Sequence, residues 1–144
     1  MDEAAFRQKL PEMLERPCSF EKSVLSRCVS CRQSQKFQIA EREAVTCKYP
    51  ASLSRCVSLH GLLRHNFSFA LGKMHDEEVL THAQEMLVQC GGLKGLQYVL
   101  DDDAEVDDVE ELLDGVLQKW GEFAEIPFSE VVHAATLIYK GRRG

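Results

Sequence analysis

The sequence lacks both a membrane-spanning segment and a secretory leader. It has no uninterrupted apolar run of the roughly 18 residues that a membrane-spanning helix needs. Its first residues, MDEAAFRQKL, lack the basic and apolar regions of a secretory leader. Low-complexity tracts are also missing, and the composition, 44% hydrophobic and 28% charged, is that of a globular chain. We therefore expect a folded protein in the cytoplasm.

A surplus of positive charge is missing as well. The net charge is -6, and it changes along the chain: residues 1–73 hold 12 Lys and Arg against 7 Asp and Glu, whereas residues 74–144 hold 5 against 16. The cations are scattered singly and form no stripe, so we do not expect a nucleic acid as partner. The acidic region 101–114 is instead a candidate docking patch for a protein.

Strand signals are scarce, because few segments alternate β-branched with polar residues. Helical periodicity is found along most of the chain, over 3–16, 30–45, 50–72, 76–90, 106–120 and 129–139. The pattern predicts an all-α fold, a small bundle of about five to seven helices with a cysteine-rich metal-binding arm. The change of charge divides the chain into a cysteine-rich region, 1–73, and an acidic helical region, 74–144, which could form one continuous domain.

The most informative feature is a group of four cysteines within 29 residues, spaced C-x2-C-x15-C-x8-C. They are Cys28, Cys31, Cys47 and Cys56. In a reducing cytosol, such cysteines favour metal binding over disulfides. Zinc sites usually assemble from two closely spaced ligand pairs, but here the last two cysteines are eight residues apart. The spacing therefore favours a four-iron cluster bound by these four thiols.

The same stretch resembles the cysteine-rich iron–sulfur module of the leucine-rich variant repeat proteins. That module also has a CxxC, a longer gap and two further cysteines before a helix. The residues that carry the resemblance are the four cysteines with Arg55 and Val57 beside the last of them. The gap between Cys47 and Cys56 is longer than in the family, and no helical repeat follows. The resemblance implies a [4Fe-4S] cluster with these four ligands.

Zinc is the alternative occupant of this stretch. Cys56 and His60 are spaced i, i+4 on a predicted helix, so they would face the same side. Together with Cys28 and Cys31 they would give three thiolates and one imidazole, a common zinc ligand set.

The other cysteines leave further alternatives open. Cys18 could be a ligand in place of Cys47, a neighbouring thiol or a small buried side chain. Cys90 lies on the apolar face of its predicted helix and is expected to be a packing residue. Without a metal, the thiols would be packed in a helical core, or Cys28 would form a reversible disulfide with a neighbour.

No arrangement of nucleophile and base, and no phosphate-binding loop, stands out in the sequence. We therefore expect no catalytic activity from this chain alone. The sequence predicts a small iron–sulfur protein, an electron-transfer or accessory subunit of a larger redox enzyme. The alternative is a zinc-stabilised helical adaptor without a redox role.

Overall fold

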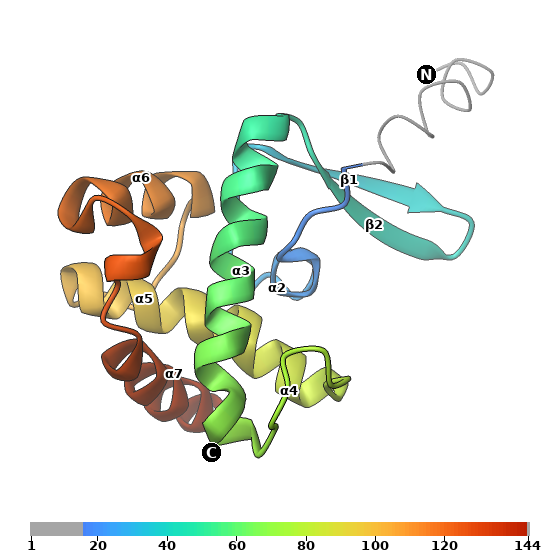
Figure 1. Ribbon diagram of the computed structural model, residues 1–144. Coiled ribbons are helices and arrows are strands. Elements are labelled where there is room, and N and C mark those ends of the chain that lie inside the picture. The colour runs from blue at the N-terminus through green and yellow to red at the C-terminus, as the bar shows by residue number, and fades with distance from the viewer. Residues whose placement is uncertain (1–15, 144) are drawn as a thin grey trace.

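The computed structural model describes residues 16–143 and is mainly helical, with one two-stranded antiparallel sheet (Figure 1). The helical character was predicted, but the all-α prediction is wrong because of this sheet. The helix predicted over 3–16 lies outside the described residues, apart from its last position. In chain order the elements are α2 (Glu21–Leu25), β1 (Ser34–Ile39), β2 (Arg42–Cys47), α3 (Pro50–Leu71), α4 (His82–Met86), the π-helical turn η1 (Leu87–Gly91), α5 (Gly92–Asp101), α6 (Val109–Trp120), the 3-10 turn η2 (Phe123–Glu125) and α7 (Phe128–Arg143).

The hairpin of β1 and β2 occupies the segment that was predicted to be a helix over 30–45. Its register pairs Ser34 with Cys47 at the base and Ile39 with Arg42 at the tip, which leaves a two-residue turn. Turns of this length favour Asn-Gly or Asp-Gly, whereas here Ala40 has a φ of 56°. The turn therefore lacks the sequence signal of a hairpin, and the sequence does not predict the pairing of the two strands.

The hairpin is held by a segment far from it in sequence. Pro17 forms a bridge with Thr46, and the backbone N–H of Cys18 donates to the carbonyl of Val45 at 2.9 Å. The N–H of Cys47 donates in turn to the carbonyl of Arg16 at 2.9 Å. These contacts run residues 16–18 alongside β2, so the strand is not an open edge at its base.

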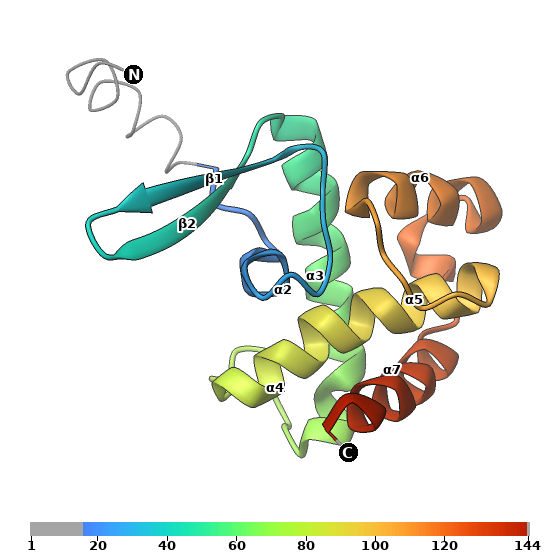
Figure 2. The same cartoon turned by 180° about the vertical axis from the view of Figure 1, so that it is seen from behind.

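The helix α3 is the central element, with the hairpin on one side and α5, α6 and α7 on the other (Figures 1 and 2). It begins at Pro50, whose missing N–H is no loss in a first turn, and ends at Gly72, which has a φ of 69°. Both limits were predicted from the sequence. Its buried face carries Cys56 near one end and Leu63 and Phe67 toward the other.

The pair Gly91-Gly92 was predicted to end a helix, but the chain stays helical through both glycines. A Cβ on Gly91 would lie 3.4 Å from the Cβ of Ala135 in α7, and one on Gly92 would lie 3.1 Å from a methyl of Leu63 in α3. The glycines therefore permit close helix packing rather than marking a helix end. The helix also begins later than the predicted 76, at a capping box in which Thr81 and Gln84 bond each other's backbone N–H groups.

The helices predicted over 106–120 and 129–139 are both present, but α6 begins three residues later than predicted and α7 begins one residue earlier, at Phe128. Asp108 caps α6 by accepting the N–H of Glu110, and Gly121 ends the helix with a φ of 84°. The buried apolar side chains form one cluster that contains residues of both halves of the chain, from Phe20 to Ala135. Within residues 16–143, no helix has both the length and the apolar composition needed to cross a bilayer.

Candidate metal centre

Four free thiols line one small cavity between α2, the base of the hairpin, α3 and the start of α6. They belong to Cys18, Cys31, Cys47 and Cys56. The cavity has a volume of about 20 Å³, close to the space that one water molecule needs. Its other walls are mostly apolar and include the side chains of Phe20, Val24, Leu53 and Val109. The structure thus gathers thiols from four separate segments of the chain.

The hairpin positions two of these thiols. Cys47 is the last residue of β2 and lies opposite Ser34, while Cys31 comes three residues before Ser34. The Cys31 carbonyl accepts both the N–H and the hydroxyl of Ser34, at 3.1 and 2.7 Å. The Cys47 thiol donates to the carbonyl of Tyr49 at 3.3 Å. The turn into β1 and the end of β2 therefore bring Cys31 and Cys47 to the same end of the hairpin.

The other two thiols come from either side of the hairpin. Cys18 is held by its backbone bond to Val45 on β2. Cys56 lies in the second turn of α3, on the buried face that also carries Ser52 and Leu59. Cys47 and Cys56 are buried, whereas Cys18 and Cys31 are partly exposed. One edge of the site therefore lies close to the surface.

Burial governs the protonation of these thiols. Removal from water, followed by repulsion from the neighbouring cysteines, raises the pKa of Cys56 to about 12. Burial likewise raises the pKa of Cys18 to about 11 and also raises the pKa of Cys31. At neutral pH these three groups are thiols, and a bound cation must displace their protons to gain thiolate ligands.

Three of the four cysteines predicted as ligands lie together in the structure. Cys31, Cys47 and Cys56 line the cavity, but the fourth wall position belongs to Cys18 rather than Cys28. Cys28 is instead joined by a disulfide to Cys90, 62 residues further along the chain. Cys90 is buried, as predicted for a packing residue, but it is also bonded, which the sequence did not indicate.

His60, the alternative zinc ligand, has both ring nitrogens engaged elsewhere. Its Nδ1 lies 2.8 Å from the hydroxyl of Ser19, and its Nε2 lies 2.8 Å from a carboxylate oxygen of Glu85. The hydrogen bond from His60 holds the pKa of Glu85 below its ordinary value. The ring also packs against Phe20, with centroids 5.0 Å apart. This chain of polar contacts connects the segment after Cys18 to α3 and α4. It cannot be predicted from local sequence, because Ser19 and Glu85 are far apart in the chain.

Arginines and acidic residues form a second network beside the thiols. Arg55 on α3 pairs with Glu110 and, at 2.8 Å, with Asp114, both on α6. Arg32 pairs with Asp108 at 3.1 Å and with Asp114 at 3.7 Å. Part of the acidic region 101–114 therefore forms ion pairs within the protein, and these pairs attach α6 to the cysteine-bearing segments.

Loss of the Arg55 pair should destabilise the protein more than loss of the Arg32 pair. Glu110 is buried, and without Arg55 its carboxylate would keep only the hydroxyl of Ser52, which donates at 3.0 Å. We expect Arg55→Leu to lower the free energy of unfolding by about 1.5 kcal/mol, as for a buried polar group that loses a partner. Arg32 is more than half exposed, so Arg32→Leu should cost less than about 0.5 kcal/mol. Urea denaturation of both variants tests this, and equal losses would contradict it.

The donor set suits a thiolate-bound metal group. Thiols are the side chains that bind structural zinc ions and iron–sulfur clusters. In the part of the chain that the structure describes, no three His, Cys, Asp or Glu side chains are drawn together in the manner of ligands to a single ion. The four thiols are thus neighbours around a cavity rather than a compact set around one point.

Comparisons with known proteins add no relative. Scans against protein-family models, curated proteins and solved structures each return no match.

Proposed function

We propose that Cys18, Cys31, Cys47 and Cys56 hold a [4Fe-4S] cluster, and that the chain is an electron-transfer or accessory subunit of a larger redox enzyme. The observation that carries this is the convergence of four unbonded thiols on one cavity. A four-iron cluster takes one cysteine per iron, so it suits a set of four thiols that do not meet at one point, provided that they move apart to admit it. When bound, the group would supply one-electron redox chemistry.

The protein's own residues would serve this role in two ways. The apolar walls formed by Phe20, Val24 and Leu53 would shield the group from water. The partly exposed Cys18 and Cys31 would leave one edge near the surface, where an electron donor or acceptor can approach. All four irons would have a protein ligand, which favours electron transfer over catalysis at the site.

The acidic surface next to α6 is the proposed docking face for the redox partner. An open depression of about 650 Å³ lies between the end of α5 and the start of α6. Its wall includes exposed carboxylates that the arginine network does not use, those of Asp101, Asp103, Glu105, Asp107 and Glu111. A partner with a basic face would fit this charge, and its association should weaken as salt is added.

A zinc-stabilised adaptor is the second candidate, and the small cavity favours it. A volume of about 20 Å³ suits one ion better than a cluster unless the thiols move apart. Zinc there would join α2, the hairpin, α3 and α6, and its binding energy would stabilise the fold directly. This protein would then act through its surface alone, without a redox role.

Metal analysis of protein expressed and purified without oxygen separates the two candidates. For the cluster we expect a brown protein with about four iron and four sulfide per chain and broad visible absorption that bleaches on reduction. A colourless protein with one tightly bound zinc would overturn the redox proposal and support the adaptor. A protein that retains neither metal, even after reconstitution with iron and sulfide or with zinc, would overturn both.

A further inference from the structure

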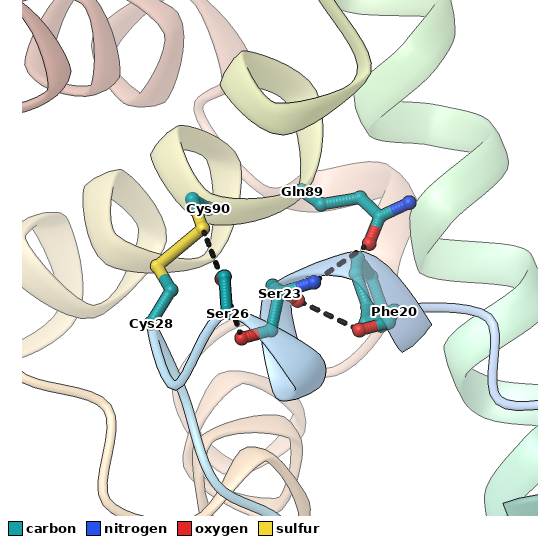
Figure 3. The surroundings of a disulfide bond; sticks show 6 residues. All are labelled: Phe20, Ser23, Ser26, Cys28, Gln89 and Cys90. Carbon is teal, nitrogen blue, oxygen red and sulfur yellow. Dashed lines mark hydrogen bonds between the residues drawn. A yellow bond between two sulfur atoms is a disulfide. The ribbon is translucent and has the colours of Figure 1, made fainter. Parts of the chain in front are cut away.

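The disulfide between Cys28 and Cys90 connects the cysteine-bearing segment to the helical half of the protein. Cys28 follows α2, and Cys90 lies in the π-helical turn η1 (Figure 3). Figure 3 shows a second contact at the same place, where the N–H of Ser23 donates to the side-chain oxygen of Gln89 at 3.2 Å. The segment around α2 is therefore fixed to η1 both by a covalent bond and by a hydrogen bond.

Cys28, which forms the disulfide, lies three residues before Cys31, which lines the thiol cavity. Between them, the carbonyl of Ser30 accepts the N–H of Val109 at 2.8 Å, at the start of α6. Figure 2 shows this connection between α2 and β1 passing close to α3 and α6. The backbone from Cys28 to Cys31 is thus short and is held at each end, by the disulfide on one side and by the cavity on the other. A displacement of Cys28 can reach Cys31 through only two residues, of which Ser30 is also held to α6.

The backbone beside the disulfide is in an uncommon conformation. Arg27 has a φ of 63°, in the left-handed region that non-glycine residues rarely adopt. Such a residue keeps this conformation only while the contacts around it hold it there. Cys28 is one of those contacts, since its N–H donates to the carbonyl of Ser23 at 3.0 Å and its sulfur is bonded to η1. Cleavage of the bond would remove one of these constraints and let the loop relax.

The two sulfurs are buried, but they lie directly under the surface. Cys28 and Cys90 are 7% and 2% exposed, whereas Ser26, Arg27 and Ser30 around them are exposed. The hydroxyl of Ser26 lies 3.8 Å from the sulfur of Cys90 (Figure 3). A small opening of this loop is enough to admit a thiol reagent. In reducing compartments, disulfides that exchange with thiols are usually catalytic or redox-sensing rather than permanent crosslinks.

We propose that the Cys28–Cys90 disulfide is a redox switch that sets how firmly Cys31 is held in the four-thiol site. In the oxidised state, η1 fixes the loop and Cys31 with it. One thiol of a dithiol reductant attacks one sulfur of the bond, which forms a mixed disulfide and releases the other cysteine. The second thiol of the reductant then attacks the reductant's own sulfur in the mixed disulfide and releases the remaining cysteine. Two electrons and two protons pass to Cys28 and Cys90, which become thiols, and the reductant becomes a disulfide. The freed loop then holds Cys31 less firmly, and, if the site binds a metal group as proposed above, it releases that group faster.

The first part of the test counts thiols in the full chain. Protein equilibrated with oxidised glutathione, stripped of metal and denatured should take up four alkyl groups, and after full reduction it should take up six, the total number of cysteines. Peptide masses should assign the two additional groups to Cys28 and Cys90. Six alkyl groups in both states would overturn the proposal, because no disulfide would then exist.

The second part measures the accessibility of Cys31 without relying on a metal. In metal-free folded protein we expect iodoacetamide to modify Cys31 about tenfold faster in the Cys28→Ser/Cys90→Ser double variant than in the oxidised parent. The melting temperature of the double variant should fall by about 10 °C, as expected for loss of a crosslink over a long loop in a chain of this size. The modification rate is read well below either melting temperature, and Cys56 serves as an internal control that should not change. Equal rates at Cys31 would overturn the switch even if the disulfide forms.

The third part links the switch to the proposed metal group. Transfer of the bound metal to a competing chelator should be faster from reduced than from oxidised protein, and in the double variant it should be fast with or without reductant. A faster reaction of Cys31 in a protein that binds no metal would uphold the switch and defeat the proposed function. If the protein binds a metal and transfers it at equal rates in both redox states, the proposed function would stand and the switch would be overturned.

Discussion

Replacing Cys18 with serine should abolish the bound metal group, whereas the Cys28→Ser variant should still bind the group, although it should release it faster than the parent protein does. The structure places Cys18 on the wall of the thiol cavity and Cys28 in a disulfide with Cys90. A serine hydroxyl does not ionise near neutral pH and is a poor ligand for the metals that bind thiolates. The metal content of Cys18→Ser should therefore fall below about a tenth of the parent value. Metal and sulfide analysis after purification without oxygen provides the measurement.

These two variants also distinguish the two possible ligand sets, one that contains Cys18 and one that contains Cys28. Both cysteines are upstream of the hairpin and differ by only ten positions, so they are closely matched. If Cys28→Ser lost the metal and Cys18→Ser kept it, the CxxC pair would be the true ligand pair and the cavity described here would not be the site. Circular dichroism of both variants would show whether any loss of metal follows from a loss of fold.

Placing a methyl group on Gly95 should be the most disruptive change in the helical half. A Cβ at this position would lie 2.7 Å from the carbonyl oxygen of Val131 and 3.0 Å from the backbone nitrogen of Ala135. These are backbone atoms of α7, so they cannot rotate away, and the two helices must separate. We expect Gly95→Ala to lower the free energy of unfolding by about 3 kcal/mol, the upper end of the range for overpacking.

Gly61 offers a matched control for this change. It lies within α3 and is exposed, and a Cβ there would meet no atom within 4 Å. Gly61→Ala should therefore stabilise the protein by about 0.5–1 kcal/mol, because alanine loses less backbone freedom in a helix. Urea denaturation midpoints of the two variants provide the comparison. A loss of less than about 1 kcal/mol in Gly95→Ala would mean that α5 and α7 are not packed as closely as described.

The parts of the fold that local sequence determines were predicted well. The regular apolar stripe of α6 and its end at Gly121 are properties of one continuous segment, and so are the Pro50 start and Gly72 end of α3. The hairpin could not be predicted in this way. Phe37 and Ala44 are partners across the strands, but seven positions apart they also suit two turns of helix. Contacts with distant residues favour the strand, among them residues 16–18, which run beside β2, and Glu21, which accepts the N–H of Val45.

The candidate site was predicted in part for the same reason. Cys31, Cys47 and Cys56 were identified as candidate ligands from their residue type and proximity in sequence, and the structure brings them to one cavity. The fourth member depends on the hairpin, because Cys18 reaches the cavity through its bond to Val45 on β2. A CxxC indicates a ligand pair only if its two thiols turn to the same side. Here Cys28 turns toward Cys90 instead, and nothing within the four residues of the motif reveals this.

The helix α3 lies wholly in the cysteine-rich region, 1–73, yet it contacts both the thiol cavity and the helical half. The helix has 22 residues, so it spans about 33 Å. Near its first turns it carries Cys56 and Arg55, and further along it packs Leu63 against Gly92 of α5. It therefore acts as a rigid rod shared by the thiol cavity and the helical half. Because the helix is continuous, a displacement of one end should be transmitted to the other. Loss of a ligand at the thiol cavity should therefore affect the helical half, and a mutation in the helical half should affect the cavity.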